Sequence, residues 1–455
     1  MTKGVIEAIS SYIGRMGRLR LPEEVVEKAK HHILDTLAAA VSGSKLGPGI
    51  LAIGYVRDQG GIGEAVVVGS GMMTSAIHAA FANGIMAHAD ETDDSHAKSL
   101  THPGCAIVPA ALALSEKKGL DGVSFLRGVV AGYDIGCRIT QALGVENLRE
   151  RYRSTHSMGA NFGAAAAGAV LLRLKGDQVK YVFSYAAQQA SGMTYWVRGG
   201  ERAEKAFVFS GMPSRNGVTA ALLVESGFAG ISDPFSGERN FFEAFSSDPK
   251  PELLTEKLGQ HYEITVTNIK KYPVGSPIQA PLQAVLNLRE KHGLKAEEVK
   301  RIVVRMAREG MKTVDHARIP DINLQYILSV AMLDGALSFG AAHSYRRMKD
   351  RPVLKAMEQI SLVEDPVLTV SDNKRQAIVE ISTKDGASLR EHVVSVRGTA
   401  ENPMTRQEIE EKCQDLMKPI LGRDRTERLI DKIWNLEKVK NVRQLRPFLS
   451  RTGRN

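Results

Sequence analysis

The feature that most constrains the fold of this chain is a change in the spacing of apolar residues near His261. Before that point they recur three or four positions apart, as on one face of an α-helix. The clearest case follows the helix-start signal Pro22-Glu23-Glu24 and comprises Val25, Ile33, Leu34, Leu37 and Val41. Many of these segments are rich in Ala and Gly, so we expect tightly packed internal helices up to about residue 266.

After that point the apolar residues alternate, as they do in strands. We expect strands over four segments, 261–267, 301–306, 377–383 and 390–396. The last two flank Asp385-Gly386, which favours a hairpin turn. Amphipathic helices are expected between the strands, over 278–292 and 324–342. A helical pattern returns after Asn402, where Thr405 and Glu408 match a capping box.

These patterns predict a mainly α protein with two domains, which a length of 455 residues also favours. A large all-helical domain would comprise residues 1–266 and 400–455. A smaller α+β lid domain, residues 267–399, would be inserted before the C-terminal helices.

The net charge of +9 is concentrated at one end of the chain. Residues 421–455 contain ten Lys and Arg against four acids, which we interpret as a solvated helical face and not as a nucleic-acid footprint. The three cysteines lie far apart and form neither a zinc motif nor a disulfide framework. No apolar run reaches the ~18 residues of a membrane span, and the first residues lack a signal-peptide pattern. We expect a cytoplasmic protein without nucleic-acid or membrane partners.

One segment, residues 88–104, combines His88, His96 and His102 with the acids Asp90, Glu91, Asp93 and Asp94. Three interpretations are open: a divalent-metal site, a metal-free acid–base centre, or a polar loop between helices. The His-x-x-x-His spacing of a helix-borne metal site is absent, so we expect no metal on these residues. His102-Pro103-Gly104 precedes a helix start, where free N–H groups attract anions.

Three further segments could contribute to a site. His156 lies in a Gly-containing turn before an Ala-rich helix, and could line a pocket or belong to a helix cap. Lys205 precedes an apolar stretch, a place where a lysine usually lies at the surface. Lys270 precedes a Gly-Ser-Pro turn and a helix, so the N–H groups of Gly275 and Ser276 could form a carboxylate or phosphate cradle.

The order of these segments resembles that of the MmgE/PrpD family, which includes 2-methylcitrate dehydratase and cis-aconitate decarboxylase. The resemblance covers nearly the whole chain. It rests on Asp93–His96 with His102–Gly104, Lys205 with Gly211, Lys270 with Tyr272-Pro273, the segment Tyr326–Gly335, and Asn402-Pro403.

The resemblance implies a helical body with a lid, a homodimer, and chemistry without a cofactor. It implies a catalytic role for His102 and places in the active site for Lys205, Lys270, Glu91, Ser95 and Tyr326. We further expect Asp94 to assist His102 in catalysis, and Gly275, Ser276, Gln279 and His156 to bind substrate together with Tyr326. Two positions depart from the family pattern. No His follows Tyr272-Pro273, and Ser154 stands where relatives carry a His.

We therefore predict a lyase, specifically a hydro-lyase, that acts on a small di- or tricarboxylate of the methylcitrate or aconitate type. An isomerase, an epimerase and a decarboxylase are the alternatives within the family. A metal-dependent hydrolase and a carboxylate-binding protein that has lost catalysis are the alternatives outside it. We expect the pocket between the two domains, with Lys205, Lys270 and His102 close together.

Overall fold

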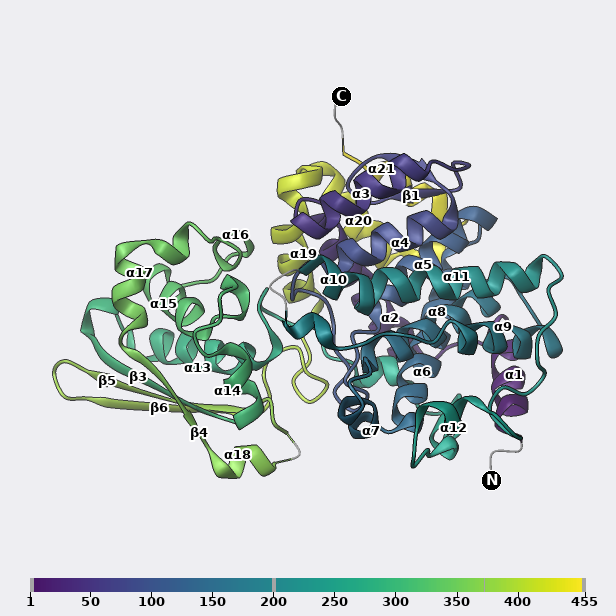
Figure 1. The fold of residues 1–455 in the computed structure, drawn as a ribbon. Helices are drawn as coiled ribbons and strands as arrows, with labels where there is room; N and C mark the ends of the chain where they lie inside the picture. Colours follow the sequence, from purple (N-terminus) through teal and green to yellow (C-terminus); the bar gives the residue numbers. More distant parts are fainter. Residues whose placement is uncertain (1–3, 199–201, 372, 452–455) are drawn as a thin grey trace. The chain divides into compact units, whose positions relative to one another are not determined.

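The computed structural model describes residues 4–198, 202–371 and 373–451 and divides into two compact units (Figure 1). Unit 1 comprises Met1–Ala89, Asp93–Asn268 and Ile409–Asn455, and unit 2 comprises Asp90–Thr92 and Ile269–Glu408. The units change at 268/269 and 408/409, where the sequence analysis placed its boundaries at 266/267 and 399/400. The short segment Asp90–Thr92, inside the polar 88–104 region, belongs to unit 2, while its neighbours on both sides belong to unit 1.

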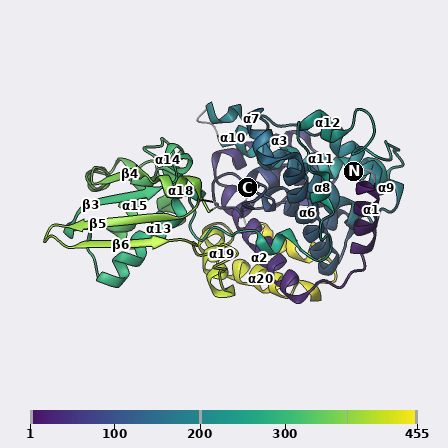
Figure 2. The ribbon, with the colours of Figure 1, turned by 90° about the horizontal axis from the view of Figure 1, so that it is seen from below.

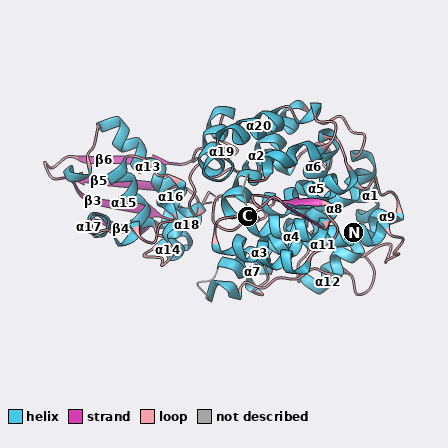
Figure 3. Ribbon diagram, turned by 90° about the horizontal axis from the view of Figure 1, so that it is seen from above, coloured by secondary structure: helices cyan, strands magenta, loops and turns pink. Residues whose placement is uncertain are grey.

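Unit 1 is mostly helical, as predicted (Figure 3). Its helices are α1 (Val5–Met16), α2 (Glu23–Gly43), α3 (Gly47–Gln59), α4 (Ala76–Ala87), α5 (Gly104–Lys118), α6 (Gly122–Leu143), α7 (Val145–Glu150), α8 (Thr155–Leu171), α9 (Asp177–Gln188), α10 (Arg202–Ala206), α11 (Met212–Glu225), α12 (Phe241–Phe245), most of α19 (Arg406–Leu421), α20 (Arg423–Trp434) and α21 (Arg446–Leu449). A π-helical turn, η2 (Phe207–Gly211), joins α10 to α11, and 3₁₀ turns occur at Tyr195–Arg198, Pro251–Leu254, Glu263–Val266, Leu436–Lys438 and Val442–Leu445.

Glycine allows the two central helices, α6 and α8, to pack backbone against backbone. A Cβ atom on Gly136 would lie 2.7 Å from the carbonyl oxygen of Gly159, and one on Gly163 would lie 2.8 Å from that of Gly132. Real Cβ atoms do not approach a carbonyl this closely, so only glycine fits at these crossing points. The dense small residues of the sequence thus mark internal helices, as expected.

Two predictions about this unit were wrong. It is not all-helical, because β1 (Ala65–Val67) and β2 (Met72–Thr74) form an antiparallel hairpin. Each strand has only three residues, too few to show an alternating pattern in the sequence. The strand predicted over 261–267 is instead the 3₁₀ turn Glu263–Val266. Here tertiary contacts override the alternation, because Glu263 is buried against His96 and its N–H donates to Asp134.

Unit 2 contains a four-stranded sheet with the order β4-β3-β5-β6 (Figure 2). The strands are β3 (Val299–Met306), β4 (Ile360–Glu364), β5 (Ala377–Thr383) and β6 (Ser388–Val393). Strands β3 and β4 are parallel, and the other neighbours are antiparallel. The predicted hairpin is confirmed as β5–β6, with Gly386 in its turn at a φ of 98°.

The helices of unit 2 are α13 (Ser276–His292), α14 (Arg308–Val314), α15 (Leu324–Asp334), α16 (Phe339–Ala342), α17 (Arg351–Met357) and α18 (Pro366–Val370). Helices α13 and α15 pack on one face of the sheet around a common apolar core (Figure 1). Short 3₁₀ turns occupy Ala296–Glu298, Pro320–Ile322 and Arg347–Lys349. The helix predicted over 324–342 is broken, because Gly335 ends α15 with a φ of 79°.

The last helical stretch begins as the sequence predicted. Glu408 N–H donates to Thr405 Oγ1, and Thr405 N–H donates to the Glu408 carboxylate, so the capping box is present. Among the described residues, no single helix has the length and hydropathy of a membrane span. Helices α2 and α3 meet that test only as a pair, and they are bent by 84° from each other.

Candidate active site

Three histidines of unit 1 surround one phenylalanine. The ring of Phe209 stacks on His156 with a centroid distance of 3.7 Å and on His88 with one of 4.6 Å. The ring of His102 lies 5.1 Å from that of His88 and 5.0 Å from that of His156. Residues more than 100 positions apart in the sequence therefore form one cluster, which we call the histidine cluster.

Three helix ends and one π-helical turn position these rings. His88 follows the last residue of α4, His102 precedes α5, and His156 lies in the first turn of α8. Phe209 is in the π-helical turn η2, which shifts the register between α10 and α11. Such turns are rare and are frequent at functional sites. The cluster thus combines helix starts, where N–H groups are free, with an irregular helix.

A single carboxylate supports two of these histidines. Asp93 is fully buried, and its Oδ2 lies 2.8 Å from His88 Nδ1 and 3.3 Å from His102 Nδ1. Asp93 and His88 were absent from the residues that the sequence analysis proposed for the site. The hydrogen bond between His88 Nδ1 and Asp93 fixes that ring and its tautomer. The contact of Asp93 with His102 is an ion-pair contact at Nδ1, which leaves Nε2 of His102 outside it.

The other histidines of the cluster are neutral near pH 7. Burial holds the pKa of His88 below its ordinary value, although Asp93 acts in the opposite direction. Burial also holds the pKa of His156 well below its ordinary value, and the neighbouring side chains of His102, His88 and Lys205 disfavour a further positive charge there. His102 thus lies beside the uncharged rings of His88 and His156 and the carboxylate of Asp93.

Asp94 has a different role from the one predicted for it. Its carboxylate accepts hydrogen bonds from His32 Nδ1 at 2.8 Å, from Tyr133 Oη at 2.6 Å and from Gly104 N–H at 3.0 Å. The last of these groups is at the start of α5, so Asp94 holds the helix that follows His102 in place. The direct neighbour of His102 is Asp93, and we assign its support to that residue.

Ser95 and His96 anchor the same loop to the helical body. Ser95 pairs with Asn268 through two backbone hydrogen bonds of 2.8 and 2.9 Å, and its side chain is partly exposed. His96 lies between Ser99 Oγ at 2.7 Å and the Glu263 carboxylate at 3.0 Å. Burial alone would lower the pKa of His96, but Cys137 and Glu263 raise it to about 10. These contacts fix the ring of His96 within the loop.

Lys205 lies beside the histidine cluster and is partly buried. Its ammonium group is 5.1 Å from the centroid of Phe209 and 5.5 Å from that of Trp196. A cation over an aromatic face gains electrostatic attraction from the ring. The sequence pattern favoured a surface lysine at this position, whereas the structure places Lys205 in contact with the ring that joins the histidines.

Unit 2 contains the second candidate lysine. Lys270 and Glu91 are both buried, and Lys270 Nζ lies 3.6 Å from Glu91 Oε2. Glu91 comes from the short Asp90–Thr92 segment, and Lys270 follows the first residue of the long unit 2 segment. Lys270 and Glu91, two of the residues that the family resemblance implied, thus lie close together in unit 2.

Three predicted substrate-binding groups already have partners within unit 2. The Gln279 side-chain amide binds Tyr272 N–H, Tyr272 O and Val274 O at 2.7–3.2 Å. Tyr326 is fully buried, and its hydroxyl donates to Ala341 O at 2.5 Å. Gly275 N–H donates to Asp321 O at 2.9 Å. Gln279 and Tyr326 therefore fix local structure, and Gly275 contributes no free N–H. Ser276 is partly exposed at the start of α13, and its substrate-binding role stays a prediction.

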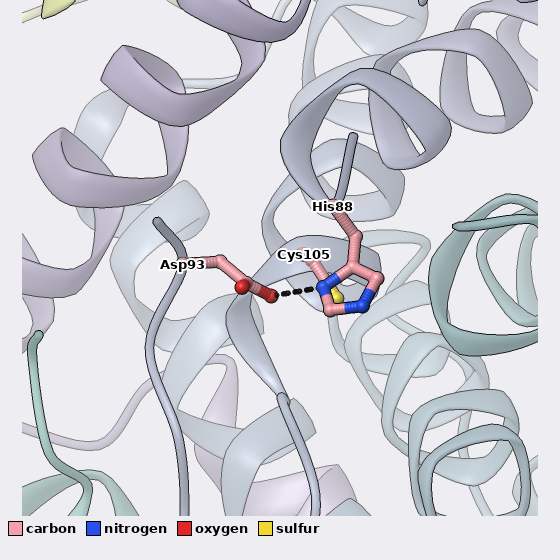
Figure 4. Close-up of side chains that lie close together, drawn as sticks. All are labelled: His88, Asp93 and Cys105. Atoms are coloured by element: carbon pink, nitrogen blue, oxygen red, sulfur yellow. Dashed lines mark hydrogen bonds and ion pairs between the residues drawn. The ribbon is translucent and has the colours of Figure 1, made fainter. Parts of the chain in front are cut away.

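One group of side chains has the composition of a metal site. His88 Nδ1, an Asp93 oxygen and Cys105 Sγ lie within 4.8 Å of one another and are all buried (Figure 4). The His88–Asp93 distance of 2.8 Å is that of a hydrogen bond, drawn as the dashed line in Figure 4. Cys105 Sγ donates to His102 O at 3.0 Å. Hydrogen bonding accounts for the arrangement, and the thiol helps to fix the backbone of His102.

Comparisons with known proteins identify the family of the chain. The model of the MmgE/PrpD N-terminal domain matches residues 7–254, and that of the MmgE/PrpD C-terminal domain matches residues 272–437. Similar proteins include a cis-aconitate decarboxylase-like protein of Aspergillus oryzae, 24% identical with 94% of each chain covered. They also include cis-aconitate decarboxylases of Aspergillus terreus, 24% identical over 98% of this chain and 96% of the relative, and of Homo sapiens, 22% identical over 99% and 95%.

Proposed function

Because the chain belongs to the MmgE/PrpD family, we propose that it is a lyase that acts on a small di- or tricarboxylate of the aconitate type, and that it works as a hydro-lyase. The observation that carries the proposal is the contact between His102 and buried Asp93 beside Lys205 and two neutral histidines. This is the arrangement that proton transfer next to a carboxylate requires, namely an oriented base and a nearby cation.

In the proposed reaction His102 Nε2 removes the proton from a carbon next to a substrate carboxylate. The electron pair left on that carbon is delocalised into the carboxylate, which then carries additional negative charge. The imidazolium returns the proton to the hydroxyl on the neighbouring carbon, which leaves as water while the double bond forms. Asp93 at Nδ1 stabilises the imidazolium between the two transfers.

The two lysines supply positive charge for an anionic substrate. Lys205 lies over aromatic rings, a setting that shields its charge less than water does. Lys270 is buried beside Glu91, so its charge is partly balanced in the free protein. We propose that each ammonium group binds a substrate carboxylate, and that Glu91 assists Lys270 in placing it. Ser95, whose side chain is partly exposed near the same loop, would add a hydroxyl contact.

Decarboxylation is the second candidate, because the similar proteins are named as cis-aconitate decarboxylases or decarboxylase-like. Here the bond to one carboxylate breaks, carbon dioxide leaves, and the electron pair remains on the carbon. Protonated His102 then delivers a proton to that carbon. Both reactions pass through negative charge next to a carboxylate, so the same residues serve either one.

One experiment tests the proposal and separates the two reactions. The protein is incubated in D₂O with 2-methylcitrate, citrate, cis-aconitate and malate, and products are followed by NMR. Dehydration gives an alkene without carbon dioxide, whereas decarboxylation gives carbon dioxide and a deuterium on the new C–H bond. His102→Ala is the matched control. Wild-type protein that neither turns over nor exchanges protons in any member of this panel would contradict the proposal.

A further inference from the structure

A partly buried histidine in unit 2, His343, lies between two buried carboxylates. Its Nε2 is 3.1 Å from Asp90 Oδ2 and 3.5 Å from Asp321 Oδ2, and its Nδ1 is 2.9 Å from Phe339 O. The side chain of His343 is 13% exposed, while those of Asp90 and Asp321 are 2% and 1% exposed. The sequence analysis did not identify His343 or Asp321 as part of a site.

Each of the two aspartates also holds a backbone segment, Asp90 through its carboxylate and Asp321 through its main-chain carbonyl. Asp90 accepts hydrogen bonds from Thr92 N–H at 2.9 Å and Thr92 Oγ1 at 2.6 Å, which closes a tight turn around Glu91. The carbonyl oxygen of Asp321 accepts the N–H of Gly275 at 2.9 Å, next to Ser276 and the start of α13. His343 therefore connects the turn that presents Glu91 to the turn that precedes α13.

The charges of this cluster make His343 difficult to replace. Burial alone would lower the pKa of His343, but Asp321 and Asp90 raise it to about 10, so the ring is an imidazolium near pH 7. Burial also acts to raise the pKa of Asp90, yet His343 keeps it below its usual value. Without this cation two buried carboxylates would lose their shared partner, and uncompensated buried charge is strongly unfavourable.

We propose that His343 is a positioning residue for the reaction, because it fixes Asp90 and Asp321 and thereby holds Glu91 beside Lys270 and the Gly275 turn before α13. This inference rests on the proposed function only for its effect on turnover. The positioning itself concerns contacts within unit 2 and can be measured without a substrate.

The first test measures amide hydrogen exchange in His343→Asn, a change that removes the charge. Exchange at Thr92 and Gly275 is expected to rise, because their acceptors belong to Asp90 and Asp321. His316→Asn is the matched control. His316 belongs to the same unit and lies 3.8 Å from Asp315, but its side chain is 67% exposed. Unchanged exchange at Thr92 and Gly275 in His343→Asn would overturn the inference, whatever the substrate proves to be.

The second test measures kcat and KM on the substrate found in the D₂O panel. A shift of ~1 Å in a substrate-positioning group costs about a hundredfold, so kcat/KM of His343→Asn should fall by about 10–100-fold. In the double variant with Lys270→Met, which acts through the same contacts, the fold loss of kcat/KM should be smaller than the product of the two single losses. In the double variant with Lys205→Met in unit 1, it should equal that product. A general loss of folding would instead combine equally with both lysine variants, and that outcome contradicts the inference.

A third variant covers the case in which His343→Asn does not fold. His343→Lys keeps a cation between the two carboxylates and should recover part of the exchange protection and of kcat/KM. The His343→Lys protein could instead fold and keep the full kcat/KM of the wild type, and Lys270→Met and Lys205→Met could lower its kcat/KM as much as they lower that of the wild type. That result would show that the imidazole has no positioning role. If no carboxylate is turned over by the wild type, the proposed function fails, while the exchange measurement still decides the role of His343.

Discussion

The histidine cluster of unit 1 and the group of His343, Asp90 and Asp321 in unit 2 both combine histidine with aspartate, but their histidines differ in charge. In unit 1, His88 and His156 have lowered pKa values and stack on Phe209, and a single carboxylate serves both His88 and His102. In unit 2, His343 is a partly buried cation with two carboxylates, and Lys270 is paired with Glu91. The difference shows that burial alone does not determine the charge of a histidine, because the charged and hydrogen-bonding groups around the ring act on its pKa as well.

This contrast separates two tasks of the proposed reaction. A histidine with a carboxylate at Nδ1 can pass a proton through Nε2, because the carboxylate stabilises the charged ring. A histidine with a pKa of about 10 keeps its proton near neutral pH and can only hold other groups in place. We therefore assign proton transfer to His102 in unit 1, and the fixing of charges to unit 2.

The largest expected effect tests the proton-transfer role. His102→Ala should lower kcat/KM by about 10²–10⁴-fold, the usual contribution of general acid–base catalysis. Its thermal unfolding midpoint should change little, because the ring is already partly exposed. His316→Asn, an exposed histidine, is the control and should keep wild-type kinetics. Wild-type activity in His102→Ala would transfer the role to His156, the neutral ring 5.0 Å away.

The next effect compares the two lysines. Lys205→Met and Lys270→Met remove the charge but keep most of the length. Each charge-assisted contact contributes about 1.5–3 kcal/mol, so kcat/KM should fall roughly 10–150-fold in each variant. Lys270→Met should also lower the free energy of unfolding, because it leaves Glu91 buried without this partner. Lys205→Met should not, since Met also packs well against Phe209 and Trp196. Equal loss of stability in both variants would contradict the contrast between the units.

The charge states predict opposite pH dependences of stability. The pKa of His343 in the folded protein is about 10, above its ordinary value of 6.5, so its contribution is complete below pH 6.5 and lost as pH rises towards 10. His88 and His156 have lowered values, so unfolded protein binds more protons and stability falls below about pH 6.5.

Urea denaturation between pH 5 and 10 measures this difference. The stability gap between wild type and His343→Asn should be largest in acid and shrink towards pH 10. The gap between wild type and His156→Asn should change in the opposite sense, because the variant lacks the group whose protonation opposes folding in acid. Parallel pH profiles for the two variants would show that the histidines do not differ in charge.

The sequence predicted the parts of the fold that depend on local pattern. Helix starts at Glu23 and Arg406 and the β5–β6 hairpin follow from caps, turns and periodicity, and they are confirmed. The 261–267 segment shows the limit of this reasoning. Its alternation is real, but the backbone follows the contacts of Glu263 with His96 and Asp134, which lie more than 120 positions away in the sequence.

The candidate site shows the same limit. His102, Lys205, Glu91 and Lys270 could be identified because they lie in motifs of the family. Asp93 stands in the same motif, but only its 3.3 Å contact distinguishes it from Asp94, whose carboxylate is used by Gly104, His32 and Tyr133. Phe209 and His343 carry no local signal, because their role depends on residues from distant segments.

A smaller effect is expected at a residue that the sequence placed in the site. Tyr326→Phe removes the hydroxyl that donates to Ala341 O and should lower the free energy of unfolding by about 1 kcal/mol. Its kcat/KM should remain close to that of the wild type, because the hydroxyl is buried in unit 2 with a backbone partner. The measurement is urea denaturation combined with steady-state kinetics. A hundredfold loss of kcat/KM without loss of stability would return Tyr326 to the substrate-binding groups.

The smallest expected effect is that of metal removal. His88, Asp93 and Cys105 are the one group of described residues close enough to hold an ion together (Figure 4). Zinc bonds of 2.0–2.2 Å in a tetrahedral site place nitrogen and oxygen ligands roughly 3.3 Å apart. The His88–Asp93 distance is 2.8 Å, and the thiol of Cys105 already donates to His102 O.

We therefore expect that dialysis against a chelator leaves turnover unchanged, and that added zinc inhibits, because it would draw Asp93 away from His102. The check is elemental analysis of protein purified without added metal, together with rates before and after chelation. One equivalent of tightly bound metal, with activity that is lost on chelation and restored by the ion, would show that this cluster is a metal centre, and would remove the contrast drawn between the two units.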